Sequence, residues 1–232
     1  MFVPLKDDNP LKVIRFQTVT LVLVAANLIV FLFTGALAKA EFSNAIAMGY
    51  GVVPVELLHP SLALPVSLNP IPEPATLLSY MFLHGSWMHL MFNMAFLWVF
   101  ADNIEDAFGH FGFAIFYVLC GIAGAMAHAV MQPLSPVPLI GASGAVSGVL
   151  GAYLLLYPRA RIWVIFFLPI PFRIPAVIVL GIWFALQILN VFAPDPDPVA
   201  VAVAVAWWAH IGGFLTGLVL TLLLRSRLLV KA

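Results

Sequence analysis

Charged residues are scarce in this sequence, and their scarcity excludes most classes of soluble protein. Lysine, arginine, aspartate and glutamate together make up 9% of the 232 residues, whereas 63% are hydrophobic and the mean hydropathy is +1.09. A soluble domain carries about 25% charged residues. The formal net charge is 0, so no basic surface for a nucleic acid is expected. The composition predicts an integral membrane protein with several spans.

Cysteine is almost absent as well. Cys120 is the single cysteine, which excludes an internal disulfide and a cysteine-based zinc site. It lies in an apolar stretch, and we interpret it as a buried, inert thiol. All ten carboxylates fall outside the apolar stretches. No His-Glu-x-x-His motif occurs, so a zinc site is a weak hypothesis, and neither a metal nor a cofactor is expected.

Apolar runs near 20 residues long predict transmembrane helices at 16–38, 77–101, 111–131, 174–192 and 202–224, with a shorter one at 143–157. A signal peptide is the alternative for the first run, but its length and Asp7 and Asp8 favour a helix. Residues 199–206 alternate valine and alanine as a strand would. A lone strand cannot span a membrane, so we interpret them as the approach to the sixth helix.

These runs predict an all-α membrane protein, a six-transmembrane-helix bundle with a short central fourth helix. Its parts are an N-terminal segment (1–15), a membrane domain (16–226) and a tail (227–232). Nine basic residues fall on one side of such a bundle, with Lys39 on the other. The nine are Lys6, Lys12, Arg15, Arg159, Arg161, Arg173, Arg225, Arg227 and Lys231. The positive-inside rule therefore predicts that both termini are cytoplasmic. We expect a multi-pass protein of the bacterial inner membrane.

Two connections carry more prolines than a simple turn needs. Residues 39–76 form a long external loop with six prolines, and residues 132–142 contain three more. Proline blocks a helix there, so the fourth helix starts late and spans only about 22 Å of a core about 30 Å thick. Non-helical backbone at that depth has to line a wet cavity or be buried in protein. We expect a water-filled depression with Ser143 at its floor.

Ser143 and His210 form the most informative pair in the sequence. Ser143 opens the short fourth helix within Gly141-Ala142-Ser143-Gly144, and His210 lies in the sixth apolar run. Small residues follow both at helical spacing, which lets two helix backbones approach closely. Ser143 alone is typical of a helix N-cap, but close packing of these two faces would unite a serine nucleophile with a histidine base. Without a carboxylate nearby, a Ser143–His210 dyad is predicted.

The second helix supplies candidate oxyanion donors. His89 and Asn93 are four residues apart and share a helix face, where either could donate to a developing negative charge. Polar packing is the alternative for both. His84 is expected to point elsewhere and to hold loop structure. His59, His110 and His128 show no partner pattern and are interpreted as structural or solvated.

At these residues the chain resembles the rhomboid family of intramembrane serine proteases. The resemblance covers roughly residues 74–224 and rests on three motifs in order: the His84–Asn93 stretch, Gly141-Ala142-Ser143-Gly144, and Ala209-His210-Ile211-Gly212-Gly213. It implies Ser143 as nucleophile and His210 as general base. It also implies an oxyanion hole of His89, Asn93 and the Ser143 amide, a turn shaped by Gly141, and a structural Glu105.

Two features depart from the family pattern. The 39–76 loop has neither the tryptophan nor the arginine that some members carry. Ser147 occupies the position where some members stack an aromatic ring on the base, so other packing must hold His210. The resemblance implies single-spanning membrane protein substrates, cut near the outer end of their span. The fifth helix is the expected gate, with Trp183, Phe184 and Gln187 as candidates.

Two other functions compete with the protease. One is a catalytically inactive relative that binds membrane proteins, although such relatives typically lose the serine or the histidine. The other is a transporter, which predicts two related halves with interrupted helices, and no such repeat is found. The natural substrate and the oligomeric state cannot be read from the sequence.

Overall fold

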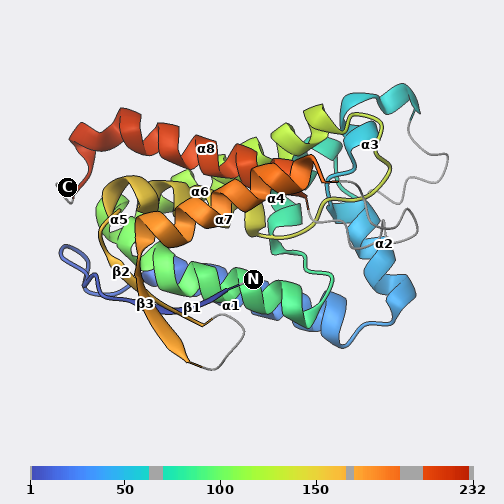
Figure 1. Cartoon of the computed structure of the whole chain (residues 1–232). Helices are drawn as coiled ribbons and strands as arrows, with labels where there is room; N and C mark the ends of the chain where they lie inside the picture. Colours follow the sequence, from blue (N-terminus) through green and yellow to red (C-terminus); the bar gives the residue numbers. More distant parts are fainter. Residues whose placement is uncertain (1, 63–69, 166–169, 194–205, 230–232) are drawn as a thin grey trace.

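A computed structural model describes residues 2–62, 70–165, 170–193 and 206–229, and Figure 1 shows the arrangement. The long helices are α1 (Thr18–Phe31), α5 (Trp87–Met131), α6 (Ser143–Leu156), α7 (Ala176–Val191) and α8 (Trp207–Leu224). Shorter helices are α2 (Ala40–Tyr50), α3 (Pro54–Leu58) and α4 (Glu73–Ser79), with brief turns η1 (Leu32–Ala36), η2 (Pro60–Leu62), η3 (Tyr80–Phe82) and η5 (Arg225–Arg227). Strands are β1 (Val3–Asp7), β2 (Arg161–Ile165) and β3 (Pro171–Pro175).

Within the described residues, three helical segments are long and apolar enough to cross a membrane. They are Thr18–Ala36, Trp87–Met131 and Trp207–Arg227, while α6 and α7 are apolar but shorter. Large apolar side chains such as Phe33, Phe111 and Leu223 are exposed on the outside of the bundle. Exposed apolar faces of this length require lipid around them. The chain is therefore an integral, multi-pass membrane protein.

α5 is two helices joined at a glycine. Gly109 has φ +70° and ψ 162°, which interrupts the helix, and a positive φ strains any residue with a side chain. A straight helix of 45 residues would be about 68 Å long. His89 near its start lies against Gly141, and Gly124 in its second half lies against Gly144, so the chain folds back at Gly109. The predicted helices at 77–101 and 111–131 correspond to these two halves.

The start predicted for the second helix was wrong. Instead of running on from residue 77, the chain passes through α4 and η3 and leaves the helix at Leu83, whose backbone is extended. α5 then begins at Trp87, and the Ser86 hydroxyl caps it by accepting a hydrogen bond from the His89 amide at 3.1 Å. An apolar run does not reveal such a break, because the residues on both sides of it are hydrophobic.

The other predicted helices lie where the apolar runs placed them. The structure has helix at Thr18–Ala36, Ser143–Leu156, Ala176–Val191 and Trp207–Leu224, each within a few residues of the expected bounds. Residues 199–205, which we interpreted as the approach to the sixth helix, lie outside the described residues. The long external loop of the prediction contains α2 and α3 within its described part.

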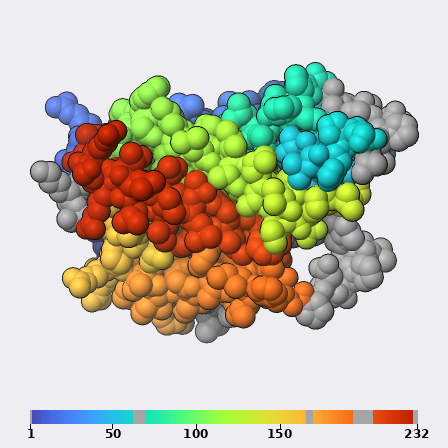
Figure 2. Space-filling view, turned by 90° about the horizontal axis from the view of Figure 1, so that it is seen from above, coloured from blue at the N-terminus to red at the C-terminus, as the bar shows by residue number. Residues whose placement is uncertain are grey.

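α6 and α8 pack backbone against backbone. A Cβ atom on Gly213 would lie 1.9 Å from the carbonyl oxygen of Gly144, and one on Gly217 would lie 2.0 Å from that of Gly148. Such distances leave no room for a side chain, so the predicted close approach of these small-residue faces is confirmed. Figure 2 shows α8 flanked by parts of α5 on one side and by α7 on the other.

A small antiparallel sheet corrects the all-α prediction. β1 pairs with β2 and β2 with β3, which ties the N-terminal segment to the connection between α6 and α7. Ile162 and Val164 alternate as fully buried side chains on β2, and Arg173 on β3 forms an ion pair with Asp8. The pairing joins residues more than 150 positions apart, which no local pattern indicates. It places both segments at the same end of the bundle.

Two carboxylates at the end of the first half of α5 anchor the N-terminal segment. Asp106 accepts hydrogen bonds from the backbone amides of Lys12, Val13 and Ile14 at 2.7–2.8 Å. Glu105 accepts from the amides of Val19 and Thr20, the first free N–H groups of α1, and from the Thr20 hydroxyl. A buried carboxylate is stabilised there by the positive end of the helix dipole. Glu105 is thus structural, as the resemblance implied.

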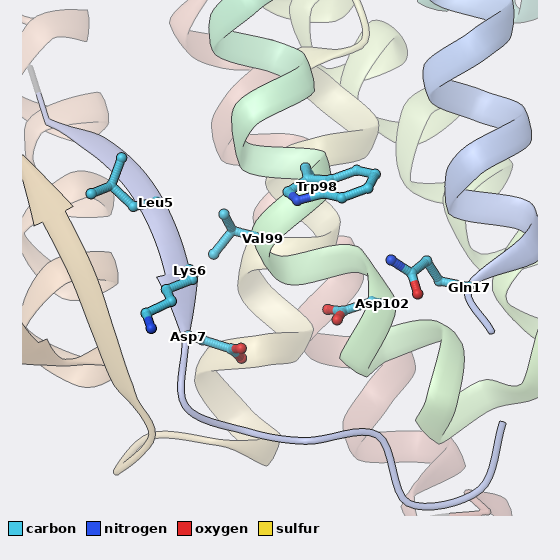
Figure 3. Close-up of a pocket in the computed structure, with 7 residues that line it drawn as sticks. All are labelled: Leu5, Lys6, Asp7, Gln17, Trp98, Val99 and Asp102. Carbon is cyan, nitrogen blue, oxygen red and sulfur yellow. The ribbon is translucent and has the colours of Figure 1, made fainter. Parts of the chain in front are cut away.

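A cavity of about 110 Å³ lies between β1 and the first half of α5 (Figure 3). The carboxylates of Asp7 and Asp102 point toward each other across it, and the Lys6 ammonium points away. Burial raises the pKa of the Asp7 carboxyl, which accepts a hydrogen bond from the Tyr153 hydroxyl on α6. Asp102 is 13 residues after His89, about 20 Å along a helix, so the cavity lies far from the Ser143 end.

The glycine contact between α6 and α8 predicts a stability difference between two glycine variants. Gly217→Ala places a methyl group 2.0 Å from a backbone oxygen that cannot move freely, and overpacking of this kind costs about 1–3 kcal/mol. Gly181→Ala on α7 has nothing within 4 Å of the new methyl and is the matched control. Thermal unfolding in detergent should show a clear loss for Gly217→Ala only. Equal melting temperatures would contradict the backbone contact.

Candidate active site

Ser143 is the first residue of α6, where the sequence predicted it. The proline-rich segment before it is held by backbone hydrogen bonds, from Gly141 to the Tyr80 carbonyl at 2.9 Å and between Val52 and Leu139 at 2.8–3.0 Å. The first amides of a helix have no partner within it, so Ser143 combines a hydroxyl with free N–H donors. Ser147, one turn later, is bound to the Ser143 carbonyl at 2.6 Å.

Gly141 lies directly against the predicted oxyanion residues. A Cβ atom on Gly141 would lie 2.6 Å from Nε2 of His89 and 3.9 Å from Nδ2 of Asn93. The φ of Gly141 is +123°, so both its backbone and its surroundings require glycine. Asn93 donates to the His89 carbonyl at 3.1 Å, which leaves its second N–H available. The structure thus brings His89, Asn93 and the turn before Ser143 together.

The contact between α6 and α8 fixes the position of His210 along α8 relative to that of Ser143 on α6. Gly144, next to Ser143, meets Gly213, and a Cβ atom on Gly144 would lie 3.6 Å from the carbonyl oxygen of Ala209. Ala209 precedes His210 directly. Ser143 is therefore one residue, and His210 one helical turn, from the tight contact between Gly144 and Gly213.

His210 is surrounded by aromatic rings and one amide. Trp183 on α7 and Trp207 on α8 each place a ring centroid 6.0 Å from the imidazole. Nδ1 of His210 lies 2.8 Å from Oε1 of Gln187. Because Ser147 stands where some family members stack an aromatic ring, other packing was expected to hold His210. The structure supplies that packing with the tryptophan pair and Gln187.

Two gate candidates contact His210 itself, which the sequence reasoning missed. Trp183 and Gln187 face His210, whereas Phe184 stacks on Phe214 with centroids 4.1 Å apart. A signal for Gln187 was present, because a polar side chain within an apolar span is expensive and is usually functional. Whether α7 acts as a gate stays a prediction.

Two further histidines lie close to this group. His84 was expected to point elsewhere, but its ring packs edge-on against His89 with centroids 5.0 Å apart. Helical spacing did not apply to it, because residues 83–86 are not helical. His128 lies on the turn of α5 that packs on α8, where a Cβ atom on Gly212 would lie 2.4 Å from that of Ala127. Within the described part of the chain, both ring nitrogens of His84 and Nδ1 of His128 are buried without a hydrogen-bond partner.

The remaining histidines lie away from this group or carry out another task. Nδ1 of His110 is 2.5 Å from Glu105, at the anchored end of the bundle. His59 caps the C-terminal end of α3. Within the described residues, no cluster of three or more histidine, cysteine, aspartate or glutamate side chains is arranged to hold a metal ion.

A family model described as the Rhomboid domain matches residues 72–227, which is more than half of the chain. The chain therefore belongs to the rhomboid family, and the resemblance seen in its three motifs is confirmed. The matched range contains all the residues gathered around Ser143 and His210.

Individual relatives include proteins named as proteases. The chain is 30% identical over 151 residues to RHOMBOID-like protein 5 of Arabidopsis thaliana, covering 65% of this chain and 44% of that protein. It is 35% identical over 115 residues to Rhomboid protease GluP of Bacillus subtilis, covering 50% of this chain and 22% of that protein. The chain thus matches less than half the length of each.

Proposed function

We propose that this protein is an intramembrane serine endopeptidase that hydrolyses peptide bonds in or near the transmembrane segments of other membrane proteins. The observation that carries the proposal is the convergence of three elements. The turn at Gly141 and the start of α6 present Ser143, the first half of α5 presents His89 and Asn93, and α8 presents His210. Membership of the rhomboid family and relatives named as proteases support it.

In the proposed mechanism, Ser143 Oγ attacks the scissile carbonyl while the imidazole of His210 takes its proton. The carbonyl oxygen becomes negatively charged, and the Ser143 amide, His89 and Asn93 donate hydrogen bonds to it. His210 then protonates the leaving amine, and the acyl group stays on Ser143. Water, activated by His210, hydrolyses this ester and restores the serine. All these groups begin neutral, which suits a site within a membrane.

The proposed architecture has six spans, with α6 as the short fourth helix and both termini in the cytoplasm of a bacterial cell. Residues 1–15 and 227–232 are its cytoplasmic ends, and 39–76 form its external loop. Support comes from the basic residues and from the β1–β2 pairing, which joins the N-terminal segment to the α6–α7 connection at one end. Ser143 and His89 would then open toward the outer side. The proposed substrates are single-spanning proteins cut near that side.

The proposed dyad makes a prediction about paired variants. Ser143→Ala and His210→Ala should each abolish cleavage of a transmembrane test substrate, and the double variant should be no worse, because residues that act as a unit are not additive. Ser147→Ala, one turn later on the same helix, is the matched control and should keep most of the activity. Full cleavage by Ser143→Ala would show that this serine is not the nucleophile.

The proposed oxyanion donors make a second prediction. Losing one preorganised donor typically costs about 10²–10³ in kcat, or about 2.7–4 kcal/mol. We expect the low end for Asn93→Ala and a larger loss for His89→Ala, with kcat falling more than KM rises. Asn27→Ala is the control, since Asn27 makes the same bond to the carbonyl four residues earlier in α1. If Asn93→Ala destabilises the protein but the fraction that stays folded cleaves at the wild-type rate, Asn93 serves only packing.

A third prediction tests the orientation. In a Cys120→Ala background, cysteine at Gln132, which follows α5 and is exposed, should react with a membrane-impermeant thiol reagent in intact cells. Cysteine at Arg161, exposed at the start of β2, should react only after the membrane is opened. The reverse labelling pattern would place the Ser143 end on the cytoplasmic side and overturn the charge-based topology.

A further inference from the structure

Gln187 is a buried amide in the last third of the apolar helix α7, and both ends of the amide form hydrogen bonds. Its side chain is 5% exposed. Nε2 donates to the Trp183 carbonyl one turn earlier at 2.9 Å, and Oε1 lies 2.8 Å from Nδ1 of His210. α7 thereby contacts Nδ1 of His210 and leaves Nε2 of the same ring outside this bond.

These two bonds determine which ring nitrogen of His210 carries the proton. The Trp183 carbonyl can only accept, so the NH₂ group of Gln187 must face it and Oε1 must face the imidazole. Oε1 can also only accept, so Nδ1 of His210 must be the donor. A neutral imidazole carries one proton, and Nε2 is therefore left with its free lone pair.

We propose that Gln187 is the positioning residue of His210 and takes the place of the carboxylate that orients the histidine in a serine triad. This inference rests on the proposed function of Ser143 and His210. When the Ser143 proton moves to Nε2, the imidazolium keeps its Nδ1–H on Oε1 of Gln187. The amide dipole stabilises that charge without a second ion, which is less costly in a membrane than a carboxylate.

The surroundings of His210 make this effect measurable. Trp183 and Trp207 cover the ring, and neither is charged. Among the described residues, the titratable groups whose charge would act on the ring are His89 and His128, both from α5. α7 has no titratable side chain, α8 has only His210, and α6 has only Tyr153. A change of charge at position 187 should therefore act directly on His210.

The test is the rate at which an alkyl fluorophosphonate labels the full chain in detergent micelles, measured as a function of pH. This readout follows Ser143 and His210 and needs no natural substrate. Gln187→Leu should label about tenfold more slowly, which corresponds to the loss of one hydrogen bond. The acid limb of its profile, where the labelling rate falls as His210 is protonated, should shift to lower pH. Gln187→Glu should keep most of the rate near neutral pH and shift the acid limb to higher pH, because a carboxylate favours the imidazolium.

Asn190→Leu is the matched control. Asn190 lies one turn from Gln187 on α7 and makes the same kind of bond, to the Leu186 carbonyl at 2.7 Å. Its rate and pH profile should equal those of the wild type. If Gln187→Leu fails to fold, the shift of the acid limb in Gln187→Glu alone tests the positioning role. Unchanged acid limbs in the folded variants overturn the positioning role, whereas undiminished labelling of Ser143→Ala overturns the proposed function instead.

Discussion

The contact between the backbones of α6 and α8 is the constraint on which the site depends. Lipid is as apolar as leucine, so transmembrane helices gain little from burying apolar side chains and associate through close packing. Here Gly213 and Gly217 leave space for the carbonyl oxygens of Gly144 and Gly148. Because Ser143 and His210 each lie beside this contact, the packing that holds the bundle together also sets the spacing of the two residues.

The polar groups near Ser143 differ in kind from those that anchor the N-terminal segment. At the anchored end, Glu105 and Asp106 bind backbone amides, and Asp8 pairs with Arg173. The candidate site instead gathers imidazoles and the amides of Asn93 and Gln187. A membrane penalises ions more than dipoles, so chemistry at depth is better served by amides and imidazoles.

Much of the candidate site could be predicted because its signals are local. Prolines before Ser143 and small residues after it predict where α6 begins, and the four-residue spacing of His89 and Asn93 predicts their shared face. The pairing of Val3 with Ile165 could not be predicted, because it depends on distant segments meeting. Likewise, position 187 is visibly polar, but its contact with His210 depends on how α7 packs on α8. The prediction that His84 points elsewhere was wrong, because it extended helical spacing into a segment that is not helical.

The most direct test of the account is to locate the adduct of a serine-reactive phosphonate by mass spectrometry of the intact membrane protein and its peptides. The account predicts one adduct per chain, on Ser143 and not on Ser147, and none when His210 is replaced by alanine. An adduct on another residue, or an unchanged adduct on Ser143 without His210, would contradict the claim that the two residues act together.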